Sequence, residues 1–84
     1  MSNGAPRTDS DQDANKVLGE VVAELRRRAG LTQAALAERA EMQEQEIAAL
    51  ESGSLEPTWG DLRHVAHALE VPLPELLALT EGNG

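Results

Sequence analysis

His64 and His67 lie three positions apart in a stretch whose apolar spacing is helical, and histidine is a common metal ligand. Asp61 precedes them on about the same face, so the three side chains could hold a divalent cation. The pattern is short and common, and the chain has no cysteine. We therefore interpret both histidines as partly exposed residues of a polar helix face and predict no metal site.

Carboxylates are the most numerous titratable groups, with 15 Asp and Glu residues against 7 Lys and Arg. Glu44 and Glu46 are two positions apart in a predicted helix, which turns their side chains to different faces and prevents them from acting as an acid–base pair. The sequence also lacks a glycine-rich phosphate loop and a nucleophile with a plausible base. We predict that the chain is not an enzyme and uses no cofactor.

The acidic balance limits the partners. A formal net charge of −8 over 84 residues repels nucleic-acid phosphates, so binding to them depends on where individual charges lie. No apolar stretch approaches the length of a membrane span or a signal peptide core, so we expect a cytoplasmic protein with no membrane partner. Trp59 is the only aromatic residue, which favours a helical core of Leu, Ile, Val and Ala.

The segment LTQAALAERAEMQEQEIAALESG, residues 31–53, reads as two short helices joined by a tight turn. Apolar residues recur at helical spacing on both sides of an interruption at Glu41, with Leu36, Ala37 and Ala40 before it and Ile47 and Leu50 after it. This spacing predicts a helix-turn-helix.

Further helices flank this pair. Residues 1–15, rich in Gly, Pro, Ser, Asp and Asn, are predicted to be a disordered tail, and residues 16–81 to form the domain. Cap and stop residues bound five predicted helices. The first runs from Lys16 to a stop at Gly30, the second from a Thr32 cap to about Ala40, and the third from about Gln43 to Ser52 before Gly53. The fourth begins at Thr58, which forms a capping-box arrangement with Asp61, and the fifth begins at Pro72 and Pro74 and contains the leucines that precede Gly82. Trp59 is expected to cover the edge of the core.

The sequence resembles the Cro/phage-repressor (Xre-like) helix-turn-helix family over roughly residues 17–79. The resemblance rests on LTQAALA at 31–37, the Ile-x-x-Leu-Glu-x-Gly pattern at 47–53, the Pro57-Thr58 pair and VPLPELL at 71–77. It implies an all-α, five-helix lambda-repressor-like domain that regulates transcription by binding double-stranded DNA. It also implies a homodimer, for which the fifth helix is the expected contact.

In this family the third helix lies in the major groove and the start of the second helix meets a phosphate. Carried over to this chain, Thr32 and Gln33 would meet the phosphate. Candidate base contacts are Gln43, Glu44, Gln45, Ala48 and Ala49, and candidate backbone contacts are Arg27, Arg28, Arg39 and Arg63. A glutamine amide can bond both N6 and N7 of adenine. The arginines could instead be solvated or pair with Glu24 or Glu38.

The chain departs from this family pattern in its charge. No Lys or Arg occurs from Ala40 to Leu62, and the loop after the third helix, often basic in relatives, is Ser54-Leu55-Glu56. The same fold could therefore serve as an acidic protein-interaction module with weak or no DNA binding, such as an adaptor, a coactivator-like bridge or an antitoxin-like partner, that binds a basic protein.

Two further expectations concern stability. Glu41 occupies the turn position that relatives usually give to Gly, so it is predicted to take a positive φ at a cost of about 1 kcal/mol. The resemblance also implies that Glu51 pairs with Arg26 and ties the first helix to the third. This role is structural and not catalytic.

Overall fold

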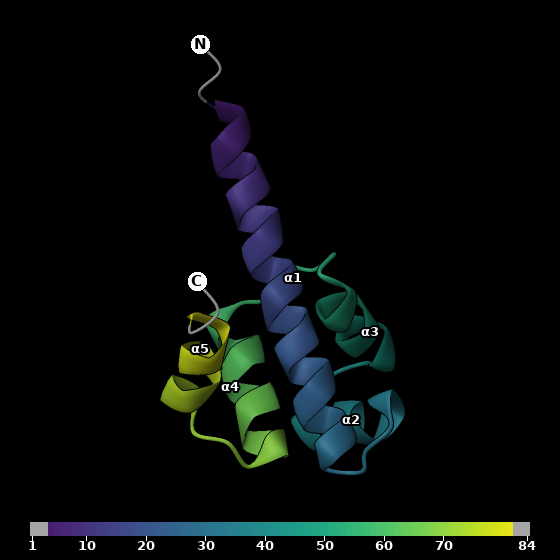
Figure 1. The fold of residues 1–84 in the computed structure, drawn as a ribbon. Coiled ribbons are helices and arrows are strands. Elements are labelled where there is room, and N and C mark those ends of the chain that lie inside the picture. The colour runs from purple at the N-terminus through teal and green to yellow at the C-terminus, as the bar shows by residue number, and fades with distance from the viewer. Residues whose placement is uncertain (1–3, 82–84) are drawn as a thin grey trace.

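The computed structural model describes residues 4–81, and the side chains from residue 14 onward. Its five helices are α1 (Gly4–Arg28), α2 (Gln33–Ala40), α3 (Glu44–Ser52), α4 (Trp59–Leu69) and α5 (Leu73–Glu81). Helix α1 runs along the molecule with α2 and α3 on one side and α4 and α5 on the other (Figure 1). The all-α, five-helix prediction is confirmed.

Helix α1 begins at Gly4, whereas the sequence predicted a helix start at Lys16 after a disordered tail. Residues 4–15 therefore differ from the prediction, and residues 1–3 of that tail lie outside the described residues. No Gly or Pro occurs between residues 7 and 15 to stop a helix. Extending an existing helix fixes one residue for each hydrogen bond gained, which is far less costly than nucleating a new one.

One hydrophobic core joins all five helices. Its completely buried large side chains are Val22 from α1, Leu36 from α2, Ile47 and Leu50 from α3, Val65 from α4 and Leu76 from α5. Each comes from the apolar stripe of an amphipathic helix, so the core follows from the helical spacing of the sequence. Helix α1 packs on both α3 and α5, which places it at the centre of the bundle.

Trp59 does not cover the core edge as predicted, because 65% of its surface is exposed. It is the first residue of α4, and helical side chains lean toward the N-terminal end of their helix. The indole of a first residue therefore extends past the helix end and away from the buried stripe below it.

Gly19 is a point of close approach between α1 and the end of α3. A Cβ at this position would lie 2.4 Å from the Leu50 carbonyl oxygen and 2.5 Å from that of Glu51. These are backbone atoms that cannot rotate away, so glycine is required there. The contact sets how deeply the end of α3 sits against α1.

The turn inside the helix-turn-helix has the predicted backbone strain. Glu41 has a φ of 59° and ends α2 in the left-handed conformation, with its N–H bonded to the helix carbonyls. Glu70 ends α4 in the same way with a φ of 60°, which the sequence analysis did not foresee. Side chains other than glycine adopt this conformation at a cost of about 1 kcal/mol or more.

Candidate nucleic-acid interface

The start of α2 has the cap that the sequence predicts. Thr32 caps the helix by accepting a hydrogen bond from the Ala35 N–H at 3.0 Å. The N–H groups of Gln33 and Ala34, in the first turn, have no carbonyl partner within an α-helix. Together with the positive end of the helix dipole, such groups favour a phosphate oxygen.

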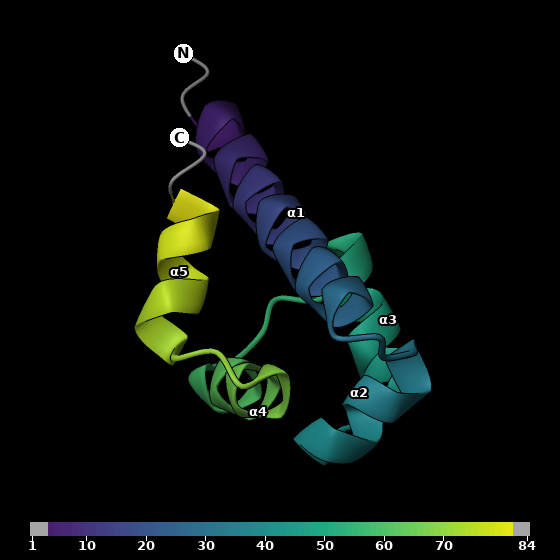
Figure 2. The same ribbon diagram turned by 60° about the horizontal axis from the view of Figure 1, so that its bottom comes forward.

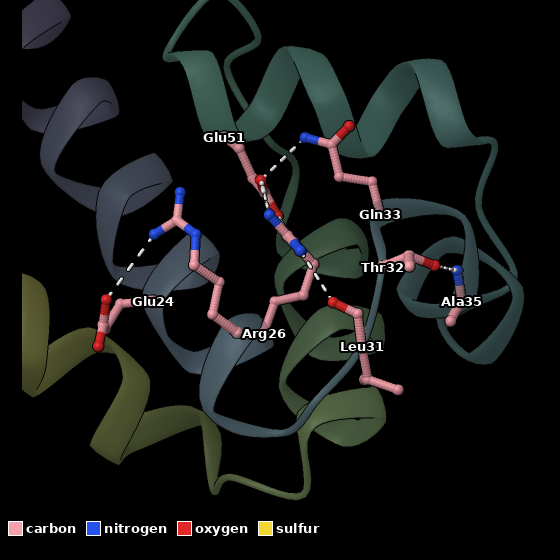
Figure 3. Close-up of polar contacts among 8 residues, drawn as sticks. Glu24, Arg26, Leu31, Thr32, Gln33, Ala35 and Glu51 are labelled. Carbon is pink, nitrogen blue, oxygen red and sulfur yellow. Dashed lines mark hydrogen bonds and ion pairs between the residues drawn. The ribbon is translucent and has the colours of Figure 1, made fainter.

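Glu51 organises the side chains around this helix end (Figure 3). Its carboxylate accepts hydrogen bonds from Arg26 Nε at 2.6 Å and Arg26 Nη2 at 3.1 Å, which confirms the predicted pair. It also accepts one from Gln33 Nε2 at 2.9 Å. Arg26 Nη1 donates in turn to the Leu31 carbonyl at 2.8 Å, so the network spans α1, the loop after it, α2 and α3.

This network is largely shielded from water. The side chains of Arg26 and Glu51 are only 13% and 7% exposed. The hydrogen bond to Glu51 raises the pKa of Arg26 above its ordinary value, so the guanidinium remains charged at any pH used in solution work. The bond to Gln33 had no signal in the sequence, because it depends on how closely α2 and α3 pack.

Three of the predicted contact residues meet in one surface pocket of about 430 Å³. Arg27 comes from α1, Gln33 from α2 and Ala48 from α3, and the rest of the lining is Glu20, Ala23, Glu24, Glu51 and Ser52. Arg27 Nη1 lies 3.7 Å from a Glu24 oxygen, and Arg28 Nε lies 3.0 Å from the other. In the free protein, both Arg27 and Arg28 therefore pair with Glu24, which was the predicted alternative to contact with DNA.

The predicted base contacts lie at the start of α3. Gln43 is the residue before the helix, and Gln43, Glu44 and Gln45 are all exposed, whereas Ala48 is half-buried. Glu46 has a local task, because its carboxylate accepts a hydrogen bond from the Gln43 N–H at 2.9 Å. The spacing of Gln43 and Glu46 was the available signal for this contact, since it matches a capping box.

Two of the predicted backbone contacts, Arg39 and Arg63, lie outside the pocket around Gln33. They line a separate pocket between the end of α2 and one face of α4, together with His64 and His67. Both histidines are exposed. Within the described residues, no group of three or more His, Cys, Asp or Glu side chains could hold a metal ion.

These features define the class of protein. Helix α2, the strained turn at Glu41 and helix α3 form a helix-turn-helix, held against α1 by the Arg26–Glu51 pair. A family model described as a helix-turn-helix domain matches residues 17–79. The chain belongs to this family, and within it to the Cro/phage-repressor (Xre-like) type.

Solved structures of similar fold support this assignment. The clp gene regulator ClgR from Corynebacterium glutamicum is 27% identical with a TM-score of 0.77, over 83% of this chain and 91% of that one. The restriction-modification controller protein C.AhdI from Aeromonas hydrophila is 28% identical with a TM-score of 0.75, over 81% of this chain and 97% of that one. No curated protein sequence matches the chain.

No helix in residues 4–81 is long and apolar enough to cross a membrane.

Proposed function

We propose that this protein is a transcriptional regulator that binds double-stranded DNA in a sequence-specific manner, with α3 in the major groove. The observation that carries the proposal is the Glu51-bound Gln33 side chain beside the first-turn N–H groups of α2. The family membership favours DNA binding over an acidic interaction module. The two structural neighbours, a gene regulator and a restriction-modification controller, point the same way.

Gln33 is the proposed phosphate contact. Glu51 engages one of the two hydrogens on Gln33 Nε2 and holds the amide in place, which leaves the second for a phosphate oxygen. The N–H groups of Gln33 and Ala34 can add main-chain bonds to the same phosphate. A donor that is already fixed loses little side-chain entropy on binding. The hydrogen bond from Gln33 to Glu51 therefore preorganises the phosphate contact in the free protein.

The exposed side chains of Gln43, Glu44 and Gln45, with Ala48 behind them, are the proposed base contacts. A glutamine can bond adenine in two places, Glu44 can accept from cytosine N4, and Ala48 can meet a thymine methyl group. The cap bond from Gln43 N–H engages the Glu46 carboxylate, and the positive end of the α3 dipole lies beside both glutamates. Local structure therefore offsets part of the negative charge on this helix.

Arg27 lines the same pocket as Gln33 and Ala48, and it can exchange Glu24 for a phosphate because their exposed pair is weak. We further propose a cytoplasmic homodimer in which α5 forms the contact, supported by the 42% exposed side chain of Leu79 on that helix. Two-fold symmetry would set the recognition helices about 34 Å apart, one duplex turn.

The test is selection of duplexes from a random library, followed by fluorescence anisotropy of the selected duplex at about 50 and 200 mM salt. We expect Gln45→Ala to relax the sequence preference at one position, with a loss of about 1–3 kcal/mol for the best sequence. Gln33→Ala should weaken all duplexes alike. Failure to select any sequence, together with no salt-dependent binding, would contradict the proposal and favour a basic protein partner.

A further inference from the structure

Helices α2 and α4 form a second pocket whose lining is mostly basic. Figure 2 shows the two helices beside each other at the lower end of the bundle. The pocket measures about 430 Å³, and its lining residues are Arg39, Ala40, Glu41, Arg63, His64 and His67. It shares none of them with the pocket around Gln33, so it is a separate site.

Among the described side chains, the arginines of this pocket differ from Arg26, Arg27 and Arg28 in having no carboxylate partner. Arg26 pairs with Glu51, and Arg27 and Arg28 both pair with Glu24. Among residues whose side chains the structure describes, neither Arg39 nor Arg63 forms an ion pair. In a chain with a formal net charge of −8, two cations that line one pocket without a carboxylate in ion-pair contact leave their charge available to a ligand.

The chemistry of the lining selects an anion with several oxygen atoms. The two guanidinium groups offer forked N–H donors whose planar geometry fits phosphate. His64 and His67 add ring N–H donors. Ala40 is the only apolar residue in the lining, so the pocket has little to offer an apolar ligand. Glu41 and the carbonyl end of α2 carry negative charge at one edge, which favours phosphate groups on the α4 side.

We propose that this pocket binds a small molecule carrying at least two phosphate groups. Its volume falls within the range of about 300–1,000 Å³ that small-molecule sites occupy. The site is distinct from the proposed DNA interface and does not depend on it. Because Glu41 belongs both to the pocket and to the turn between α2 and α3, an occupied pocket contacts the helix-turn-helix directly.

The experiment titrates inorganic tripolyphosphate into the full chain, with binding followed by calorimetry and by the Nε–H signals of the arginines in NMR spectra. We expect saturable binding with one site for each chain and shifts at Arg39 and Arg63. Arg39→Gln and Arg63→Gln should each weaken binding about tenfold, as expected for loss of a hydrogen bond to a charged group. The matched control is Arg28→Gln, which removes the same charge from an arginine with a 72% exposed side chain outside the pocket and should change the affinity less than twofold.

Circular dichroism of each variant checks that it remains folded, which is expected because these arginines are exposed. If titration is not saturable, or Arg28→Gln weakens binding as much as Arg39→Gln, tripolyphosphate senses only overall charge and the proposal is wrong.

A second arm separates a small ligand from the DNA backbone, which carries the same phosphate chemistry. Anisotropy with a mixed-sequence duplex gives the slope of log K against log salt. A small-molecule site predicts the same slope for the wild type, Arg39→Gln and Arg63→Gln. A fall of about 0.9 for each variant would mean that these arginines contact DNA phosphates, and would overturn the small-molecule assignment. Saturable tripolyphosphate binding without any DNA binding would support this site while contradicting the proposed function.

Discussion

The two pockets contain the same basic residue type in opposite electrostatic situations. Around Gln33, every arginine has a carboxylate partner: Arg26 shares Glu51 with Gln33, and Arg27 shares Glu24 with Arg28. Between α2 and α4, Arg39 and Arg63 line one pocket, and neither forms an ion pair among the described side chains. The run of arginines at residues 26–28, the most basic stretch in the sequence, is therefore the less available one, because availability depends on partners and not on local density.

Among the substitutions considered for the pocket around Gln33, Arg26→Ala should lower the free energy of unfolding most. The Glu51 side chain is only 7% exposed in the folded protein, and Arg26→Ala removes the cation that pairs with it. We expect a loss of about 3 kcal/mol in the free energy of unfolding, the lower end of the range for buried pairs because the Arg26 side chain keeps some contact with water. Urea denaturation followed by circular dichroism measures it. Arg28→Ala breaks only an exposed pair and should cost less than about 1 kcal/mol. Equal losses in the two variants would mean that the distinction between committed and exposed arginines is wrong.

Gly19→Ala should also disturb the pocket around Gln33, because it pushes the backbone of α3 away from α1. The added methyl carbon would lie 2.4 Å from the Leu50 carbonyl oxygen, so α1 and α3 must separate. Overpacking of this kind costs about 1–3 kcal/mol, and the shift should also lengthen the Arg26–Glu51 contact.

Gly60→Ala is the matched control for this change. Its new Cβ would meet nothing closer than Thr58 Oγ1 at 3.7 Å, and the change removes a flexible glycine from α4. We expect it to stabilise the protein by about 0.5–1 kcal/mol. Thermal melts of the two variants should therefore move in opposite directions, and a Gly19→Ala melt at or above the wild-type temperature would refute the close approach.

Glu41 offers the finest test, because it combines backbone strain with the only carboxylate in the α2–α4 pocket. Glu41→Gly removes both and should raise the free energy of unfolding by about 1 kcal/mol. Glu41→Gln removes only the charge and should leave stability nearly unchanged. Both variants should bind tripolyphosphate more tightly than the wild type. Tighter binding in the glycine variant alone would attribute the effect to the turn conformation instead of the charge.

Local sequence signals predicted the boundaries of most helices, and the family resemblance predicted one long-range contact. The Thr32 and Thr58 caps and the stop at Gly53 each depend on residues close in sequence, and all three are present. The Arg26–Glu51 pair was predictable through the family resemblance.

The remaining features depend on packing between segments that are distant in sequence. The Gln33–Glu51 hydrogen bond needs α2 and α3 in register, and the cluster of Arg39 and Arg63 needs α2 against α4. Trp59 has helical spacing to the buried stripe of α4, yet its position at the helix start exposes it. Apolar periodicity identifies which face of a helix is buried, but it does not show how far along the helix the burial extends.

The exposed indole of Trp59 has a spectroscopic consequence. Since the chain has one Trp and no Tyr or Phe, its intrinsic fluorescence comes from a single point at the start of α4. An indole that is already 65% exposed changes its emission little when the chain unfolds, so the wavelength of that emission is a weak measure of folding. The same indole is instead a label that needs no chemical attachment. A blue shift on adding a duplex or a second macromolecule would report that the N-terminal end of α4 has been covered.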